Sequence, residues 1–235
     1  FIYRVRIIKD GMIHMPNLGI HAGFSVNGVA SLHTEICKKD TFKDLYSLYP
    51  EKFNNKTNGI THRRWFLACN PELAKLVTSL IGDRWITHPS DLAKLEKFVD
   101  DKKVLNKVRK IKLENKIKFA KYIKEHNGID VDVNSIFDTQ IKRLHAYKRQ
   151  LMNVLRIMYY YLKLKSDKNF KMYPHTFIFG AKAAPSYSFA KNVIELINCV
   201  ANKVNNDPEV NKFMKVVFIE NYGVSSSEII IPGSD

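Results

Sequence analysis

From residue 135 onward the chain alternates between short apolar runs and longer amphipathic stretches, and this alternation constrains its fold more than any other feature. Apolar runs at 135–142, 176–180 and 215–220 have the length of buried strands. The stretches 144–164 and 185–204 between them have the length and apolar spacing of helices. Strands that alternate with helices across short connections form a parallel sheet covered by helices. The sequence therefore predicts an α/β fold for this part of the chain.

The N-terminal part of the chain lacks this order and predicts only short elements. We expect a strand over residues 1–8 and a short helix over 29–38. The stretch 49–59 is rich in turn-forming residues and predicts a long loop. Because this loop separates two kinds of sequence, we expect a domain junction there. The inner face of the short helix is expected to carry four residues, Val29, Leu32, Ile36 and Cys37.

Three helices are predicted between the loop and the first apolar run. Thr61 can cap a helix that passes through Trp65, and Asn70-Pro71-Glu72 is typical of a second helix start. That second helix should end near Gly82. The third and longest helix spans 101–126 and ends at Asn127-Gly128. Its lysines, such as Lys107 and Lys118, should form a solvated face. Its inner face is expected to carry Val104, Leu105, Val108, Ile111, Ile117, Ala120 and Ile123.

The chain is strongly basic, with 38 Lys and Arg residues against 23 Asp and Glu residues and a formal net charge of +15. Such a surplus permits binding to nucleic acid, an anionic membrane or phosphorylated substrates, and equally a plain solvated surface. No stretch is apolar for long enough to span a membrane. The three cysteines form no CxxC pair and the eight histidines show no ligand spacing, so we expect no metal site and a reducing compartment.

One strongly basic segment follows the first predicted strand. In open parallel sheets, ligands bind at the carboxyl ends of the strands. There the segment 141–150 places four cations, Lys142, Arg143, Lys148 and Arg149, at a predicted helix start. Cations are unfavourable at that end of a helix unless they hold an anion. Arg143 can bind a phosphate through its planar fork, and Lys148 adds a compact charge. The segment therefore predicts an anion site, with a solvated basic patch as the alternative.

Two weaker candidates follow the other predicted strands. The small residues of 179–186 suit close packing, and the serines of 220–228 suit a turn or a phosphate cradle. Neither contains a P-loop or a GxGxxG motif, so nucleotide binding has no direct support. We expect His145 to be a structural hydrogen-bonding residue and Cys69 to be a core residue.

Several longer segments together resemble one known family. Lys56 to Thr61, with Arg63-Arg64-Trp65, is similar to the KTNGITPRRW segment of the α-glucan phosphorylases, which act on glycogen, starch and maltodextrin. Lys142 to Gln150 is similar to their KR(I/L)HEYKRQ segment. Four further matches occur in the same order as in the family: Ser25 to Ala30, Gly180 to Pro185 with Tyr187, Asn221-Tyr222 with Val224-Ser225, and Ile231-Pro232. The resemblance covers essentially the whole chain.

The resemblance implies a large homodimeric enzyme of the GT-B type, in which two Rossmann-like domains face a cleft. Residues 1–58 would end the first, N-terminal domain, and 59–235 would begin the C-terminal domain, whose sheet is incomplete here. The implied reaction is phosphorolysis of terminal α-1,4-linked glucose to α-D-glucose 1-phosphate, with retention of configuration. The implied cofactor is pyridoxal 5′-phosphate, used through its phosphate group. The implied partners are an α-glucan and inorganic phosphate in cytoplasmic glycogen metabolism, with neither nucleic acid nor membrane.

The same resemblance implies roles for seven residues. Arg143 and Lys148 resemble the catalytic ligands of the substrate phosphate. Asn58 and Tyr147 resemble residues that bind the sugar. The cofactor-binding residues are implied to be Lys142 beside the cofactor phosphate, Trp65 against the pyridine ring, and Tyr222. The family's cofactor lysine is implied to lie beyond Asp235, so we expect this chain to be part of a longer protein.

Three alternatives stay open at the level of sequence. Ala146 stands where the family has Glu, which leaves open a non-catalytic relative. The basic surface leaves open a module that binds nucleic acid or another polyanion. A different GT-B glycosyltransferase, using a nucleotide sugar, is disfavoured by the two long motifs.

Overall fold

The computed structural model describes residues 1–235, which form two compact units, Phe1–Thr61 and His62–Asp235. The predicted junction lies between residues 58 and 59, three residues before the end of the first unit. The assignment of the two parts to the N- and C-terminal domains of a longer enzyme stays a prediction.

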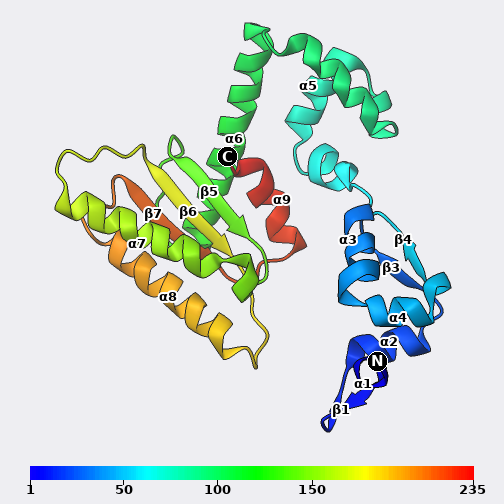
Figure 1. Cartoon of the computed structure of the whole chain (residues 1–235). Helices are drawn as coiled ribbons and strands as arrows, with labels where there is room; N and C mark the ends of the chain where they lie inside the picture. Colours follow the sequence, from blue (N-terminus) through cyan, green and yellow to red (C-terminus); the bar gives the residue numbers. More distant parts are fainter. The chain divides into compact units, whose positions relative to one another are not determined.

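The second unit contains a three-stranded parallel sheet in the order β5-β6-β7 (Figure 1). Its strands are β5 (Ile136–Ile141), β6 (His175–Gly180) and β7 (Met214–Ile219). Ile141 pairs with Gly180 and Gly180 with Ile219, so the three carboxyl ends lie level. The α/β prediction is confirmed.

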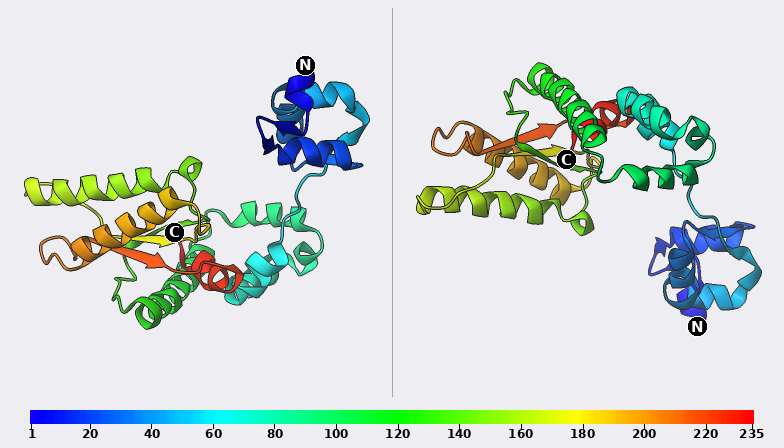
Figure 2. Two further views of the ribbon diagram at one scale, coloured as in Figure 1. Left: turned by 90° about the horizontal axis from the view of Figure 1, so that it is seen from below. Right: turned by 90° about the horizontal axis from the view of Figure 1, so that it is seen from above.

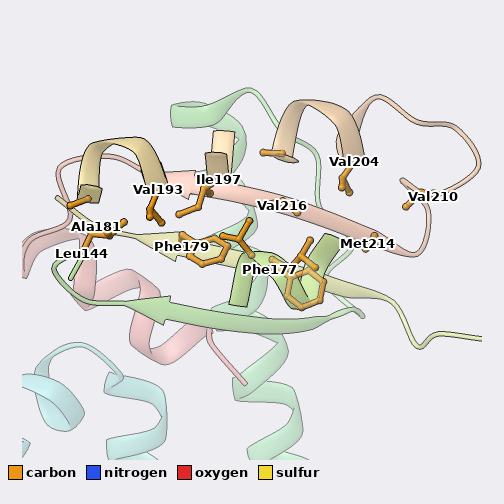
Figure 3. Packing of buried hydrophobic residues seen from close by; sticks show 14 residues of the cluster. Leu144, Phe177, Phe179, Ala181, Val193, Ile197, Val204, Val210, Met214 and Val216 are labelled. Carbon is orange, nitrogen blue, oxygen red and sulfur yellow. The ribbon is translucent and has the colours of Figure 1, made fainter. Parts of the chain in front are cut away.

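Both faces of this sheet are covered by helices. In Figure 2, α7 (Gln150–Ser166) and α8 (Ser188–Asn205) lie on one face, and α6 (Lys102–Asn127) and α9 (Val224–Gly233) on the other. Phe177, Phe179 and Val216 point toward α8, as Figure 3 shows. Successive residues alternate between the two faces, so Ile178 and Val217 pack on the opposite side, against α6 and α9. Burial on both faces explains why the strands are continuous apolar runs.

The helices after the first two strands begin later than predicted. After Ile141 the chain has no regular secondary structure until a single 3₁₀ turn over Ala146–Lys148, and α7 begins at Gln150. Arg149 has a left-handed φ of 61°, which separates the turn from the helix. Similarly, α8 begins at Ser188 and not at Pro185. The basic segment is therefore mostly a loop.

The long helix α6 has the predicted ends, but only part of the predicted inner face is inward: Ile123 is buried and Ala120 packs against the core. Asp101 Oδ1 accepts hydrogen bonds from the backbone N–H groups of Lys103 and Val104, and Gly128 has the left-handed conformation of a helix end. Only the second half of α6 packs on the sheet (Figure 1), so its buried residues are Asn115, Lys116, Phe119 and Ile123. The predicted inner residues Leu105, Val108 and Ile117 are exposed, as are the lysines Lys107, Lys110, Lys118 and Lys121.

Shorter helices precede α6. The helix α5 (Pro71–Ile81) begins and ends as predicted, at Asn70 and Gly82. Before it, Arg63–Ala68 forms a π-helical segment whose N-cap is His62, so the predicted cap at Thr61 is wrong. Two 3₁₀ segments follow α5, over Arg84–Ile86 and Pro89–Phe98. Trp85, in the first of these segments, is fully buried and packs against Phe66, in one cluster with Leu92 and Leu95 of the second segment.

The first unit differs most from prediction. Residues 1–8 form no single strand: they contain the short helix α1 (Ile2–Val5), and β1 (Ile8–Lys9) pairs with β2 (Met12–Ile13) in a hairpin. Asp10 and Gly11 have positive φ at its turn, as tight hairpins require. The remaining elements are α2 (Met15–Ala22), β3 (Val26–Gly28), α3 (Ser31–Ile36), a π-helical segment (Cys37–Thr41), α4 (Lys43–Leu48), a 3₁₀ turn (Pro50–Lys52) and β4 (Phe53–Asn55).

Two further expectations for this unit are wrong. The predicted loop 49–59 contains the strand β4, which pairs in parallel with β3. On α3 and the segment after it, only Cys37 of the four predicted inner residues is buried, whereas Leu32 is 73% exposed. The core consists instead of Val5, Ile20, Leu45 and Phe53.

Candidate functional site

The carboxyl ends of the three strands meet closely around Gly180. A Cβ atom at Gly180 would lie 2.8 Å from Ile141 Cγ2, at the end of β5, and 3.3 Å from the ring of Tyr222, which follows β7. A residue without a side chain allows this approach, whereas a Cβ atom would force Ile141 or Tyr222 to shift. The predicted site segments therefore converge on one edge of the sheet, as the rule for parallel sheets requires.

The basic loop, residues 142–149, runs beside the loop that follows β6. The backbone N–H of Lys142 donates to Gly180 O at 3.0 Å, and that of Leu144 donates to Lys182 O at 3.2 Å. Leu144 is buried in the core under α7 and α8, so it anchors the middle of the loop. Lys182 thus joins the basic loop as a fifth cation at this edge.

None of these five cations forms an ion pair with a carboxylate, although ion pairs are frequent elsewhere in the chain. Lys142, Arg143, Arg149 and Lys182 are exposed, and Lys148 is half-buried. Unpaired cations gathered at one edge create a positive potential that attracts anions. This arrangement agrees with the predicted anion site, but the cations lie on a loop and not in the first turn of α7.

Aromatic rings pack around the turn of the basic loop. The ring of His145 lies 4.4 Å from that of Tyr147 and 5.3 Å from that of Tyr187. Tyr187 Oη accepts the backbone N–H of Ala146 at 3.3 Å. Lys148 Nζ lies 5.6 Å from the centre of the Tyr147 ring, within reach of a weak cation–π contact. His145 therefore has a packing role in the turn, and Tyr147 is exposed beside Lys148.

Amide side chains hold the backbone of the basic loop, a role that was not predicted from the sequence. Gln150 Nε2 donates to the carbonyl oxygens of Lys142 and Arg143, at 3.4 and 3.2 Å. Gln140 Nε2 donates to Lys148 O at 3.2 Å, and Asn153 Nδ2 donates to Gln140 Oε1 at 3.0 Å. The available sequence signal was the presence of a glutamine two residues before the first cation and another directly after the last.

A cavity of about 450 Å³ opens at the end of β7. Its lining includes Tyr122, His126 and Lys182, together with the residues from Glu220 to Ser226 other than Tyr222. Ser226 Oγ and Ser227 Oγ both donate to Gly223 O, at 3.0 and 2.6 Å. These two serines therefore serve the first turn of α9, which favours the turn interpretation of this segment over a phosphate cradle.

The segment that carries Trp65 is tied to the same part of the unit. Arg64 Nη1 lies 2.9 Å from Glu228 Oε1 on α9, the helix that begins just after Tyr222. Trp65 itself is half-buried. Burial raises the pKa of the Cys69 thiol, more than its backbone hydrogen bond lowers it, which disfavours a thiolate nucleophile there.

Asn58 belongs to the first unit, where its backbone N–H donates to Val29 O at 3.0 Å. Within the second unit the structure brings Lys142, Arg143, Tyr147, Lys148 and Tyr222 to one sheet edge. The sugar-binding role of Asn58 stays a prediction. No group of three or more His, Cys, Asp and Glu side chains is arranged to hold a metal ion. No helix combines the length and apolarity that crossing a membrane requires.

Comparison with known protein families identifies the family of this chain. The family model of the carbohydrate phosphorylases matches residues 1–235. The chain belongs to the carbohydrate phosphorylase family. The resemblance stated from the motifs is thereby confirmed.

Individual phosphorylases show the same relationship. The chain is 50% identical to glycogen phosphorylase of Bacillus subtilis over 234 residues, 48% identical to maltodextrin phosphorylase of Streptococcus pneumoniae over 232, and 45% identical to the muscle form of human glycogen phosphorylase over 235. These matches cover 98–100% of this phosphorylase chain but only 28–31% of each relative. The chain therefore spans less than a third of the length of these relatives.

Proposed function

We propose that this chain supplies the phosphate-binding part of an α-glucan phosphorylase. Such an enzyme transfers terminal α-1,4-linked glucose from glycogen, starch or maltodextrin to inorganic phosphate, giving α-D-glucose 1-phosphate with retention of configuration. The observation that carries the proposal is the group of unpaired cations at the carboxyl edge of the sheet, in a chain of the phosphorylase family. A homodimer and a cytoplasmic location belong to the same proposal, the latter supported by three free cysteines.

Arg143 and Lys148 are the residues proposed to bind the substrate phosphate. A guanidinium can donate two parallel hydrogen bonds to a phosphate, and an ammonium adds a charge without fixing an angle. Because neither side chain is neutralised by a carboxylate, the full charge of both is available to the anion. Binding the phosphate beside the sugar places the reactants together, which removes much of the entropic cost of their encounter.

The residues at this edge also fit a second phosphate, that of pyridoxal 5′-phosphate. Lys142 is proposed to lie beside the cofactor phosphate, with Trp65 and Tyr222 against its ring. The bound cofactor would supply a phosphate group for acid–base chemistry. Two phosphates repel each other, and the five cations lower that repulsion. The backbone that carries Arg143 and Lys148 is held by hydrogen bonds before reaction, which limits its reorganisation as charge develops.

The test is to replace Arg143 or Lys148 by Ala in the complete enzyme that contains this chain. Each substitution should lower the phosphorolysis rate roughly 30- to 1,000-fold, because it removes about 2–4 kcal/mol of transition-state stabilisation. The matched control is Lys118→Ala, which removes an exposed lysine from α6. Near-normal phosphorolysis by both site variants would rule out the proposed roles.

Two alternatives predict different results in the same experiments. A polyanion-binding module would bind DNA with an affinity that falls steeply with salt, whereas a single phosphate site would show weak binding that saturates with phosphate. A non-catalytic relative would turn over no glucan even without substitutions. The residue at position 146 does not by itself support the second alternative, since Ala146 makes the loop's hydrogen bond to Tyr187 through its backbone and needs no side chain for it.

A further inference from the structure

We propose that Gln140 and Gln150 are positioning residues that hold the basic loop in the shape that directs Arg143 and Lys148 to one phosphate. The inference rests on the proposed function and deepens it. Neither glutamine is proposed to contact the phosphate: both would act through the backbone of the cationic residues.

Gln150 is placed to fix the beginning of the loop. It is the first residue of α7, and only 2% of it is exposed. Its Nε2 bridges two successive carbonyl oxygens, those of Lys142 and Arg143, in a segment without regular secondary structure. Its own Oε1 is buried without a hydrogen-bond partner, which is costly. A glutamine at such a place is best explained by the contacts of its NH₂ group.

Gln140 fixes the end of the loop. It lies in β5, and its Nε2 donates to Lys148 O across eight residues of chain. Asn153, on α7, donates to Gln140 Oε1 and so sets which end of the amide faces Lys148. This link joins the strand, the loop and the helix at the residue proposed to bind phosphate.

The charge of the loop explains why amides are used here. Four cations on one short loop repel each other, so without an anion the loop would tend to open. A carboxylate could hold the loop together, but it would neutralise the cations and compete with phosphate. An ionised carboxylate also cannot donate to a carbonyl oxygen. A neutral amide holds the loop and leaves its charge for the ligand.

The experiment uses Gln140→Met and Gln150→Met in the complete enzyme, since methionine has a similar length and no hydrogen-bonding group. Losing these neutral hydrogen bonds should raise the KM for phosphate roughly 3- to 10-fold and leave the KM for glucan unchanged. The control is Asn198→Leu, at an exposed amide on α8 that bonds only to its own helix, through Ile194 O. This control should change neither KM.

A merely structural role would lower the amount of active enzyme without a selective change in the KM for phosphate, and that result would overturn the inference. A second readout is the combination of Gln150→Met with Arg143→Ala, in which the effect of the glutamine should largely disappear because it acts through Arg143. If Gln150→Met fails to fold, the half-buried Gln140 gives the same test. Normal kinetics of the glutamine variants beside an impaired Arg143→Ala would refute the inference while leaving the proposed function intact.

Discussion

At the scale of single residues, Gly180 decides how closely the site segments can approach. It is the last residue of the central strand, and its missing side chain leaves room for Ile141 on one side and the Tyr222 ring on the other. A position where any added side chain must displace its neighbours links the packing of the sheet to the geometry of the site.

We predict that Gly180→Ala destabilises the complete enzyme by about 1–3 kcal/mol, the usual cost of overpacking. The new methyl group would displace Ile141 or Tyr222, so activity should fall as well. Thermal unfolding and phosphorolysis rates measure both effects. The control is Gly19→Ala in α2, where a Cβ has open space and helix propensity favours alanine. Equal stability of the two variants would show that the strand ends are not tightly packed.

At the scale of elements, one ion pair connects α6 to Asp235, which follows α9. Lys116 is 8% exposed, and its Nζ donates to Ser135 O and to Asp235 Oδ2, both at 2.6 Å. Asp235 Oδ2 also accepts the backbone N–H of Phe137 at 2.9 Å, and the backbone N–H of Asp235 donates to Phe137 O. Ser234 and Asp235 thus lie along the outer edge of β5, which would otherwise present unpaired backbone groups.

This ion pair predicts a dependence of stability on pH. Partial burial tends to raise the pKa of Asp235, but the hydrogen bonds from Lys116 and Phe137 outweigh it, so the pKa lies below its ordinary value. A carboxyl whose pKa is lowered by folding stabilises the folded state above its unfolded pKa, near 3.9. That stabilisation is lost as the pH falls through the lowered pKa.

The complete enzyme should therefore lose stability as the pH falls below about 4. The Asp235→Asn variant should lose less stability over the same fall in pH, because its amide does not titrate. At pH 7 the same variant should be less stable, because it leaves the buried Lys116 without its counter-charge. Urea unfolding at several pH values measures both effects. The control variant is Lys163→Met, which breaks the surface ion pair between Lys163 and Asp167. Identical acid profiles for the wild type and Asp235→Asn would contradict the prediction.

At the scale of the whole molecule, the second unit leaves apolar helix surfaces uncovered. On α7, Met152, Leu155, Tyr159 and Leu162 are spaced for one face, and each is at least 53% exposed. The first half of α6 also exposes Leu105 and Val108. Such surfaces in a soluble domain normally have partners.

We therefore predict that the 235-residue chain, produced alone, is inactive and either aggregates or stays loosely packed. Domain stability is only about 5–15 kcal/mol, so unburied apolar surface removes a large share of it. Size-exclusion chromatography, amide NMR dispersion and borohydride trapping of pyridoxal phosphate test this. A monomer with one sharp melt and a stoichiometric reduced adduct would contradict it.

The sequence by itself determined the parallel sheet, the ends of α5 and α6, and the placement of the cationic segment after the first strand of the sheet. Each follows from local information: continuous apolar runs predict strands buried on both faces, Asp101 and Gly128 mark helix ends, and cations after a strand predict an anion site. The family motifs added the proposed roles of the seven site residues.

Only the tertiary structure decided which surfaces are buried and what holds the site. The inner face of α6 depends on where the sheet ends, and β4 exists because β3 lies beside it. The late start of α7 depends on the left-handed backbone of Arg149. The basic loop is supported by hydrogen bonds from Gln140 and Gln150. Two causes determine these features: neighbours that are distant in sequence, and choices among several backbone conformations of similar energy. The periodicity of apolar residues carries no information about either cause.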